Sequence, residues 1–128
     1  MKTLTLPLNK QWFEMIKSGE KKEEYRDCSE HWIIRFVKDF KTKSSFRFEM
    51  CFRDGKFLTD DLVSDVQDCL NYLDYDSLVF TLGYPKAGDT ERRLTFKNPK
   101  IRIGTGRPEW GAEPGKLYFV ITFGDRVE

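Results

Sequence analysis

The sequence predicts an α+β fold in which a mixed, strongly curved β-sheet or small β-barrel is flanked by helices. Strand patterns occur at least twice early in the chain and four times late, with helical patterns among them. No internal repeat, low-complexity segment or Pro/Gly/Ser-rich linker interrupts the 128 residues, a length that suits one hydrophobic core. We therefore expect a single domain over residues 1–128.

The chain is expected to open with a short strand and a helix. Residues 3–6 alternate polar and apolar side chains with period two, and Pro7 is expected to end this strand. Asn9 is a favourable N-cap, an apolar stripe follows it, and Gly19 is a typical helix stop. A helix over about residues 10–18 is therefore predicted.

A second strand and a second helix are expected next. Residues 23–26 fit a strand that leaves the turn after the first helix. Residues 28–40 place large apolar side chains at helical spacing, with Ser29 as the candidate cap, and predict a helix.

The rest of the chain is expected to hold one more helix and several strands. Phenylalanine and methionine alternate with other residues over 46–53, and the Asp54-Gly55 pair that follows is a hairpin signal. Residues 59–73 put leucines and valines on one helical face. Late strands are expected at residues 77–84, 92–97, 100–103 and 116–123.

The charge balance limits the classes of partner. Lys and Arg number 22 against 21 Asp and Glu, so the chain has no net positive field to attract a polyanion from a distance. A nucleic-acid ligand would have to be bound by a local basic patch.

Cysteine and histidine usage argues against a disulfide framework or a metal site. The three cysteines form no C-x-x-C pair, and His31, the only histidine, favours a surface or structural role over a catalytic triad or a metal site. No P-loop, G-x-G-x-x-G or H-E-x-x-H motif occurs, so we expect no metal and no cofactor. The N-terminus lacks the apolar core of a signal peptide, and no stretch of about 18 apolar residues exists, which predicts a cytoplasmic protein without membrane contact.

The charged run 19–26, GEKKEEYR, is a candidate functional site, although such runs are usually exposed turns. Arg26 can grip a phosphate or carboxylate with its planar guanidinium. Lys21 can act as a base or nucleophile if desolvated, and Glu24 can accept hydrogen bonds from a base edge or relay a proton. The three converge only if Lys21 still lies in the turn after Gly19, because alternate strand residues face opposite sides.

Aromatic residues late in the chain form a second candidate. Tyr84, Trp110 and Tyr118 can stack on an unpaired base, aided by nearby Arg102 and Arg107. Core packing of Tyr118 and loop anchoring by Trp110 are the competing interpretations.

The charged run matches, at Gly19-x-Lys21-x-x-Glu24-x-Arg26, the G-x-K-x-x-E-x-R signature of the ASCH domain family, which is similar to the RNA-binding PUA domains. The chain resembles this family over most of residues 3–38 and 77–125, with the elements in the family's order. Residues of about 40–76 have no counterpart and are expected to be an insertion within the domain.

The resemblance implies a small PUA-like mixed β-barrel with flanking helices, in which the signature lines a cleft that binds RNA, a nucleotide or a nucleoside. Lys21, Glu24, Arg26 and the aromatic candidates would then contact the ligand. Some small ASCH members are amidohydrolases that deacylate N4-acetylcytidine with a lysine at the position of Lys21 and a threonine at that of Glu24. Here Glu24 departs from that pattern, and a ribonuclease activity has also been associated with the family.

Three hypotheses therefore stand. The first is a module that binds RNA or a nucleoside-like ligand without changing it. The second is an enzyme in which Lys21 is the base or nucleophile and Glu24 relays a proton. The third is a protein-interaction domain that uses the predicted helix at 59–73.

Overall fold

The computed structural model describes residues 2–36, 52–53, 56–57 and 72–127. The chain divides into two compact units, which are described separately. Unit 1 consists of Met1–Glu24, Asp74–Lys100 and Ile121–Glu128. Unit 2 consists of Tyr25–Leu73 and Ile101–Val120.

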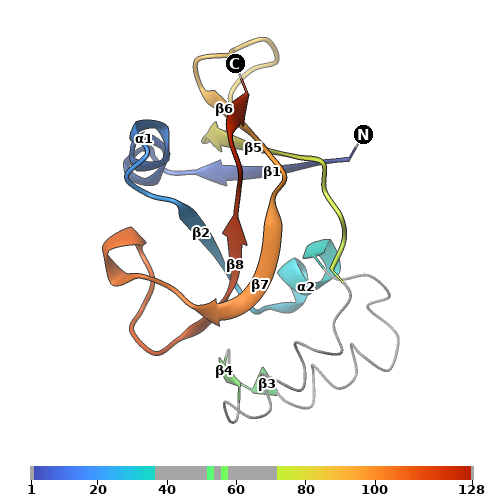
Figure 1. Cartoon of the computed structure of the whole chain (residues 1–128), viewed down its shortest axis with the longest axis vertical. Coiled ribbons are helices and arrows are strands. Elements are labelled where there is room, and N and C mark those ends of the chain that lie inside the picture. Colours follow the sequence, from blue (N-terminus) through green and yellow to red (C-terminus); the bar gives the residue numbers. More distant parts are fainter. Residues whose placement is uncertain (1, 37–51, 54–55, 58–71, 128) are drawn as a thin grey trace. The chain divides into compact units, whose positions relative to one another are not determined.

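Unit 1 is built on a four-stranded sheet in the order β1-β5-β6-β9, seen with helix α1 (Lys10–Ser18) in Figure 1. Its strands are β1 (Thr3–Leu8), β5 (Ser77–Leu82), β6 (Arg93–Lys97) and β9 (Arg126–Val127). β1 runs parallel to β5, with Leu6 opposite Phe80, whereas β6 is antiparallel to both β5 and β9. The sheet is therefore mixed, as the sequence predicts.

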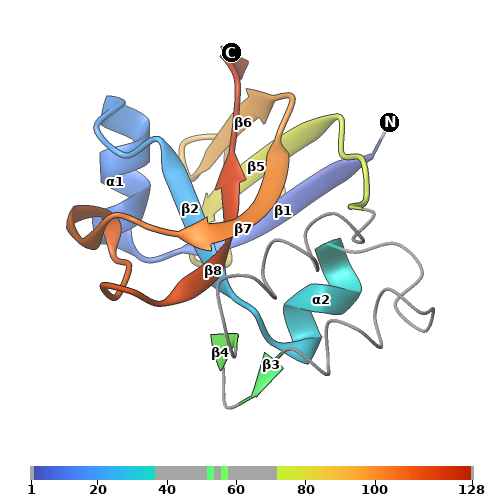
Figure 2. The same ribbon diagram turned by 60° about the horizontal axis from the view of Figure 1, so that its bottom comes forward.

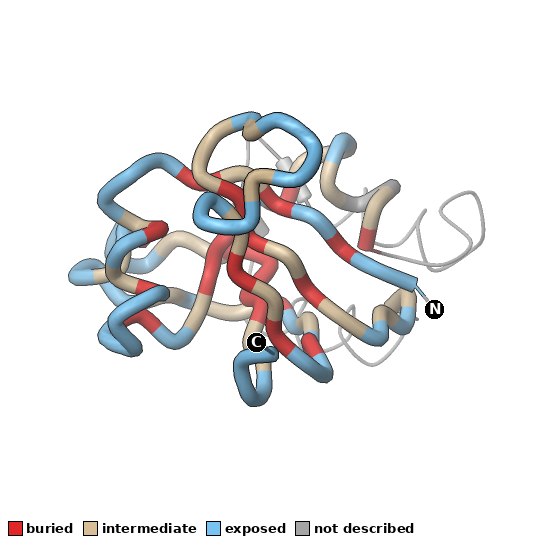
Figure 3. Tube along the Cα trace, turned by 90° about the horizontal axis from the view of Figure 1, so that it is seen from above, coloured by how far each residue is buried: buried red, intermediate tan, exposed pale blue. Residues whose placement is uncertain are grey.

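The core of unit 1 is made of leucine and phenylalanine side chains. The leucines of β1 are buried, and the tube that leaves the N-terminus in Figure 3 alternates between exposed and buried segments. Phe80, Phe96 and Phe123 form an aromatic group in which the ring centroids are 4.5–5.9 Å apart. The prediction that the opening strand turns its leucines inward is confirmed.

Pro7 does not end β1, contrary to the prediction. The strand continues to Leu8, and Pro7 lies opposite Thr81 in the parallel ladder. β1 is the first strand in the order of its sheet, and a proline is compatible with such a position because only part of the strand's N–H groups is needed for the ladder.

Helix α1 begins and ends at the residues that its sequence predicts. The side chain of Asn9 accepts a hydrogen bond from Trp12 N at 3.2 Å, and Gly19 adopts φ 87° while its N–H bonds to Ile16 O. Phe13 and Ile16 are the buried residues of the helix. Both caps act locally, which is why the helix could be predicted.

Unit 2 holds α2 (Glu30–Phe36) and most of a second sheet in the order β2-β8-β7 (Figure 2). The strands are β2 (Glu23–Asp27), β8 (Leu117–Thr122) and β7 (Lys100–Thr105), and the short 3-10 helix η1 covers Pro108–Trp110. Phe36 of α2 packs edge-on against Phe119 of β8, with ring centroids 5.3 Å apart. A two-stranded ladder, β3 (Phe52–Arg53) with β4 (Lys56–Phe57), is antiparallel.

The mixed α+β class is confirmed. The described strands form two sheets and one two-stranded ladder, and no pairing among them closes a sheet into a barrel. The helix predicted over 28–40 is present at Glu30–Phe36. The antiparallel β3 and β4 flank the Asp54-Gly55 pair, as a hairpin there requires. The predicted strand at 46–51 and the body of the predicted helix at 59–73 lie outside the described residues.

The late strands are present with shifted ends. β5 stops at Leu82, so Tyr84 lies beyond the strand, and β7 extends to Thr105. β9 was not predicted, because two residues carry no period and only the ladder with β6 defines them. Within the described part of the chain, neither helix has the length and the apolar run that crossing a bilayer requires.

Candidate functional site

Lys21 lies in the turn after Gly19, where convergence with Glu24 requires it to be. The backbone N–H of Lys21 donates to Met15 O at 3.0 Å, so the chain folds back on α1 before β2 begins at Glu23. This return is possible because Gly19 takes the left-handed conformation that ends the helix.

The turn brings the Lys21 ammonium against the Glu24 carboxylate inside unit 1. Nζ donates to Oε1 at 2.8 Å, and the two side chains are 1% and 5% exposed. Nζ also lies 4.4 Å from the centroid of the Trp12 ring, where the negative face of the indole attracts a cation. A lysine, a carboxylate and a tryptophan thus form a dry polar cluster, which we call the Lys21 cluster.

Arg26 follows on β2 and belongs to unit 2. Its guanidinium lies 5.1 Å from the Trp32 ring of α2, and that of Arg35 lies 5.4 Å from the same ring. Phe36 stacks on Trp32 with an interplanar angle of 18°. The structure therefore pairs Lys21 with Glu24 in unit 1 and places Arg26 beside Trp32 and Arg35 in unit 2.

No protein-family model, no curated protein and no solved structure matches this chain. Membership of the ASCH family stays a prediction that rests on the motif and on the order of the elements.

Two of the predicted aromatic residues take part in packing in unit 2. Tyr118 is 6% exposed, lies 5.7 Å from the Tyr25 ring, and accepts a hydrogen bond at its hydroxyl from Glu113 N. Trp110 packs against the same buried group, with the Arg107 guanidinium 4.9 Å from its ring. Tyr118 thus packs in the core and Trp110 anchors the loop, which are the interpretations that competed with base stacking in the sequence analysis.

The remaining predicted site residues lie at the surface. Tyr84 of unit 1 is 93% exposed, directly after Gly83, and Arg102 of β7 is exposed in unit 2. Both therefore present their side chains to solvent rather than to a buried cluster. His31 is exposed on α2 with its ring edge against Trp32, which agrees with the surface role favoured by the sequence.

Cys28 is the buried cysteine of the described residues, and its environment is not that of a reactive thiol. Burial, followed by the nearby Asp27 carboxylate, raises the pKa of the thiol to about 12, against a smaller lowering by Lys116. Lys116 donates to Asp27 at 3.1 Å, and this hydrogen bond raises the pKa of the ammonium. The described residues bring no three His, Cys, Asp or Glu side chains together as metal ligands.

Trp12 and Trp32 are the site residues that the sequence did not identify. Trp12 lies in the apolar stripe of the helix predicted over about residues 10–18, and Trp32 is one of the large apolar side chains of the helix predicted over 28–40. Their contacts with Lys21 and Arg26 depend on how the chain returns to each helix. A tryptophan one helix-length before a motif lysine is the only sequence signal that could have indicated the first contact.

Proposed function

We propose that this chain is an ASCH-like module with a PUA-like barrel that binds RNA or a nucleoside-like ligand through the Lys21 cluster. The observation that carries the proposal is the buried 2.8 Å contact between Lys21 and Glu24 inside the matched signature. The mixed parallel and antiparallel pairing of the strands supports the barrel.

A contribution to stability alone does not explain why Lys21 and Glu24 are buried as an ion pair. Removing two charges from water costs several kcal/mol per ion, and apolar residues of similar size often replace a buried pair without loss of stability. Buried ionisable groups with a specific charged partner are frequent at functional sites. Burial of Lys21 and Glu24 therefore favours a site over a solvated turn.

The chemistry of the pair fits the edge of a nucleobase. An ammonium donates to a ring carbonyl, a carboxylate accepts from an exocyclic amino group, and cytosine carries these two groups on one edge. Hydrogen bonds of this kind are stronger in a dry environment than in water. The Trp12 ring also contacts the ammonium, with its centroid 4.4 Å from Nζ.

Titration with cytidine, N4-acetylcytidine and short RNAs tests the proposal. Replacement of the pair by Lys21→Met with Glu24→Leu keeps the packing volume and should abolish binding, while the exposed neighbour Lys22→Met should leave it unchanged. Because the net charge is only +1, binding should weaken little with salt. Equal affinity in the double variant, or no binding of any of these ligands, would refute the proposal.

A second candidate is a hydrolase of acylated cytidine or of RNA, with Lys21 as the base or nucleophile. It is favoured by the 2.8 Å distance, which allows Glu24 to take a proton from Lys21 directly. The facing carboxylate also favours the ammonium form, which is not nucleophilic, and this places binding first. Hydrolysis that is abolished by Lys21→Ala and strongly reduced by Glu24→Gln would establish the enzyme; intact substrates after prolonged incubation would exclude it.

A further inference from the structure

Unit 1 contains an open pocket of about 580 Å³ that none of the predicted site residues lines. Phe13 of α1 and Leu82 of β5 supply its apolar part. Its volume falls within the range of small-molecule sites, about 300–1,000 Å³. The pocket is therefore large enough for a small molecule, and its lining shares no residue with the Lys21 cluster.

Three cations from three different segments face this pocket. Lys17 comes from the last turn of α1, Arg92 from the residue before β6, and Arg126 from β9. Within the described residues, the side chains of Lys17 and Arg126 make no ion pair or hydrogen bond. Arg92 pairs with Asp89 at 3.5 Å, but both side chains are about a third exposed or more, so this pair contributes little.

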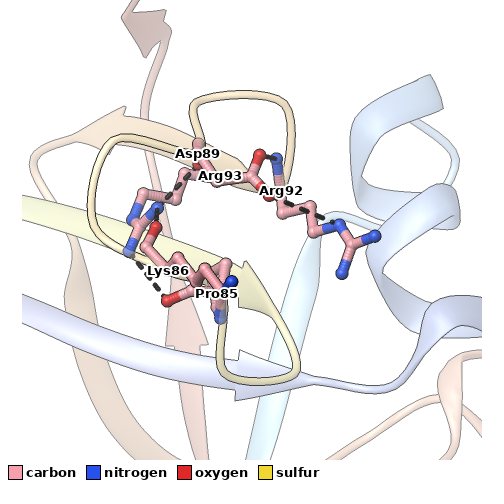
Figure 4. Close-up of polar contacts among 5 residues, drawn as sticks. All are labelled: Pro85, Lys86, Asp89, Arg92 and Arg93. Carbon is pink, nitrogen blue, oxygen red and sulfur yellow. Dashed lines mark hydrogen bonds and ion pairs between the residues drawn. The ribbon is translucent and has the colours of Figure 1, made fainter.

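The loop that supplies one wall of the pocket is held in shape before any ligand arrives. The Arg93 guanidinium donates to the main-chain carbonyls of Lys86, Asp89 and Pro85, at 3.0, 2.6 and 3.4 Å (Figure 4). Arg92 N adds a hydrogen bond to the Asp89 side chain at 3.3 Å. A wall fixed in this way reduces the entropy that binding would otherwise cost.

We propose that this pocket binds a small organic monoanion with an apolar body. The ligand's carboxylate lies between Arg126 and Lys17, because guanidinium and ammonium groups from two segments can chelate one anion. Its apolar part lies against Leu82, the half-buried apolar residue of the lining. Glu14 and Glu91 also line the pocket, so three positive and two negative charges leave a balance that suits one negative charge better than two.

Titration of the ¹⁵N-labelled protein with benzoate, followed by amide NMR, tests this site. Benzoate should shift the amides of Lys17, Thr90 and Arg126, and its neutral analogue benzamide should not. Arg126→Gln and Lys17→Met should each weaken benzoate binding about tenfold, and phenyl phosphate should bind more weakly than benzoate. The exposed Lys10→Met, on the same helix but outside the pocket lining, should bind benzoate as the parent does.

Shifts of equal size with benzamide, or unchanged benzoate affinity in Arg126→Gln and Lys17→Met, would overturn the proposal. The variant with Lys21→Met and Glu24→Leu separates this pocket from the proposed nucleoside site. It should bind benzoate normally while losing the nucleoside, and loss of benzoate binding in that variant, with a native-like spectrum, would also count against a separate site.

Discussion

Among the described residues, Lys21 and Glu24 are the charged residues with the smallest exposed fractions, and their side chains are only 1% and 5% exposed. Each makes the burial of the other tolerable, because a lone buried charge would lose its hydration without compensation. The motif therefore encodes a coupled pair, and a change to one member cannot be understood without the other.

Breaking the Lys21–Glu24 pair should cost far more stability than removing it. Lys21→Ala leaves Glu24 buried without its ammonium and should lower the free energy of unfolding by about 3–5 kcal/mol. The variant with Lys21→Met and Glu24→Leu should recover most of this loss. Urea denaturation of the two single variants and the double variant measures the coupling.

Lys22→Met serves as the control, since Lys22 is exposed and should change stability by less than about 0.5 kcal/mol. Additive effects of the two substitutions would contradict the coupling that we derive from the 2.8 Å contact.

Cys28 should react slowly with thiol reagents near neutral pH, and ionisation of its thiol should lower the free energy of unfolding at alkaline pH. Burial raises the pKa of its thiol from an ordinary 9.0 to about 12 in the folded protein, so the folded state holds the proton more tightly. The resulting stability is present below pH 9 and is lost as pH rises from about 9 to 12.

Reaction with Ellman's reagent at pH 8, in a variant with Cys51→Ser and Cys69→Ser, should be about 100-fold slower than in urea. Equal rates in the folded and unfolded protein would refute this.

At the scale of elements, the turn between α1 and β2 positions the Lys21 cluster. Gly19 ends the helix at φ 87°, and the N–H of Lys21 then bonds back to Met15 O. An ideal Cβ on Gly19 would meet no atom within 4 Å, so the need for glycine here is conformational and not steric.

Gly19→Ala should therefore destabilise the protein by about 1 kcal/mol, and Gly19→Asn by less, because asparagine tolerates the left-handed region. Thermal unfolding of the two variants measures the difference. Gln11→Ala, on the exposed face of the same helix, is the control. A cost for asparagine equal to that for alanine would show that another property of Gly19 matters.

The elements that could be predicted are those whose signals are local. Helix α1 has its cap and its stop within a few residues of its ends, and the inward leucines of β1 follow from period two. Pro7 was misread because its tolerance depends on the place of β1 in the sheet, and the contact of Trp12 with Lys21 depends on a tertiary return of the chain. The motif indicated Lys21 and Glu24 together, but its spacing could not show that Arg26 lies beside the Trp32 ring of α2.

For the whole molecule, the path of the chain links the two compact units. The chain passes between them four times, three of these within β2, β7 and β8 at the junctions 24/25, 100/101 and 120/121, and once between Leu73 and Asp74. The three strands of the sheet β2-β8-β7 thus each contribute residues to both units. Loss of order in one unit would remove part of every strand in that sheet.

Unfolding should consequently be a single cooperative transition, as expected for one domain. Amide NMR signals of Leu6 in unit 1 and of Val120 in unit 2 should disappear with the same urea midpoint. Two separate midpoints would instead mean that the units fold independently, against the single domain predicted over residues 1–128.

The three hydrogen bonds from the Arg93 guanidinium to the loop, which we call the Arg93 clamp, bear on which substitutions the pocket can accept. All three acceptors of the guanidinium are main-chain carbonyls, so the clamp is indifferent to which side chains the loop carries. Thr90, Glu91 and Arg92 can be exchanged while the loop keeps its shape. Substitutions at these three positions can therefore change which ligand the pocket selects without changing the fold, as long as Arg93 and Asp89 are retained.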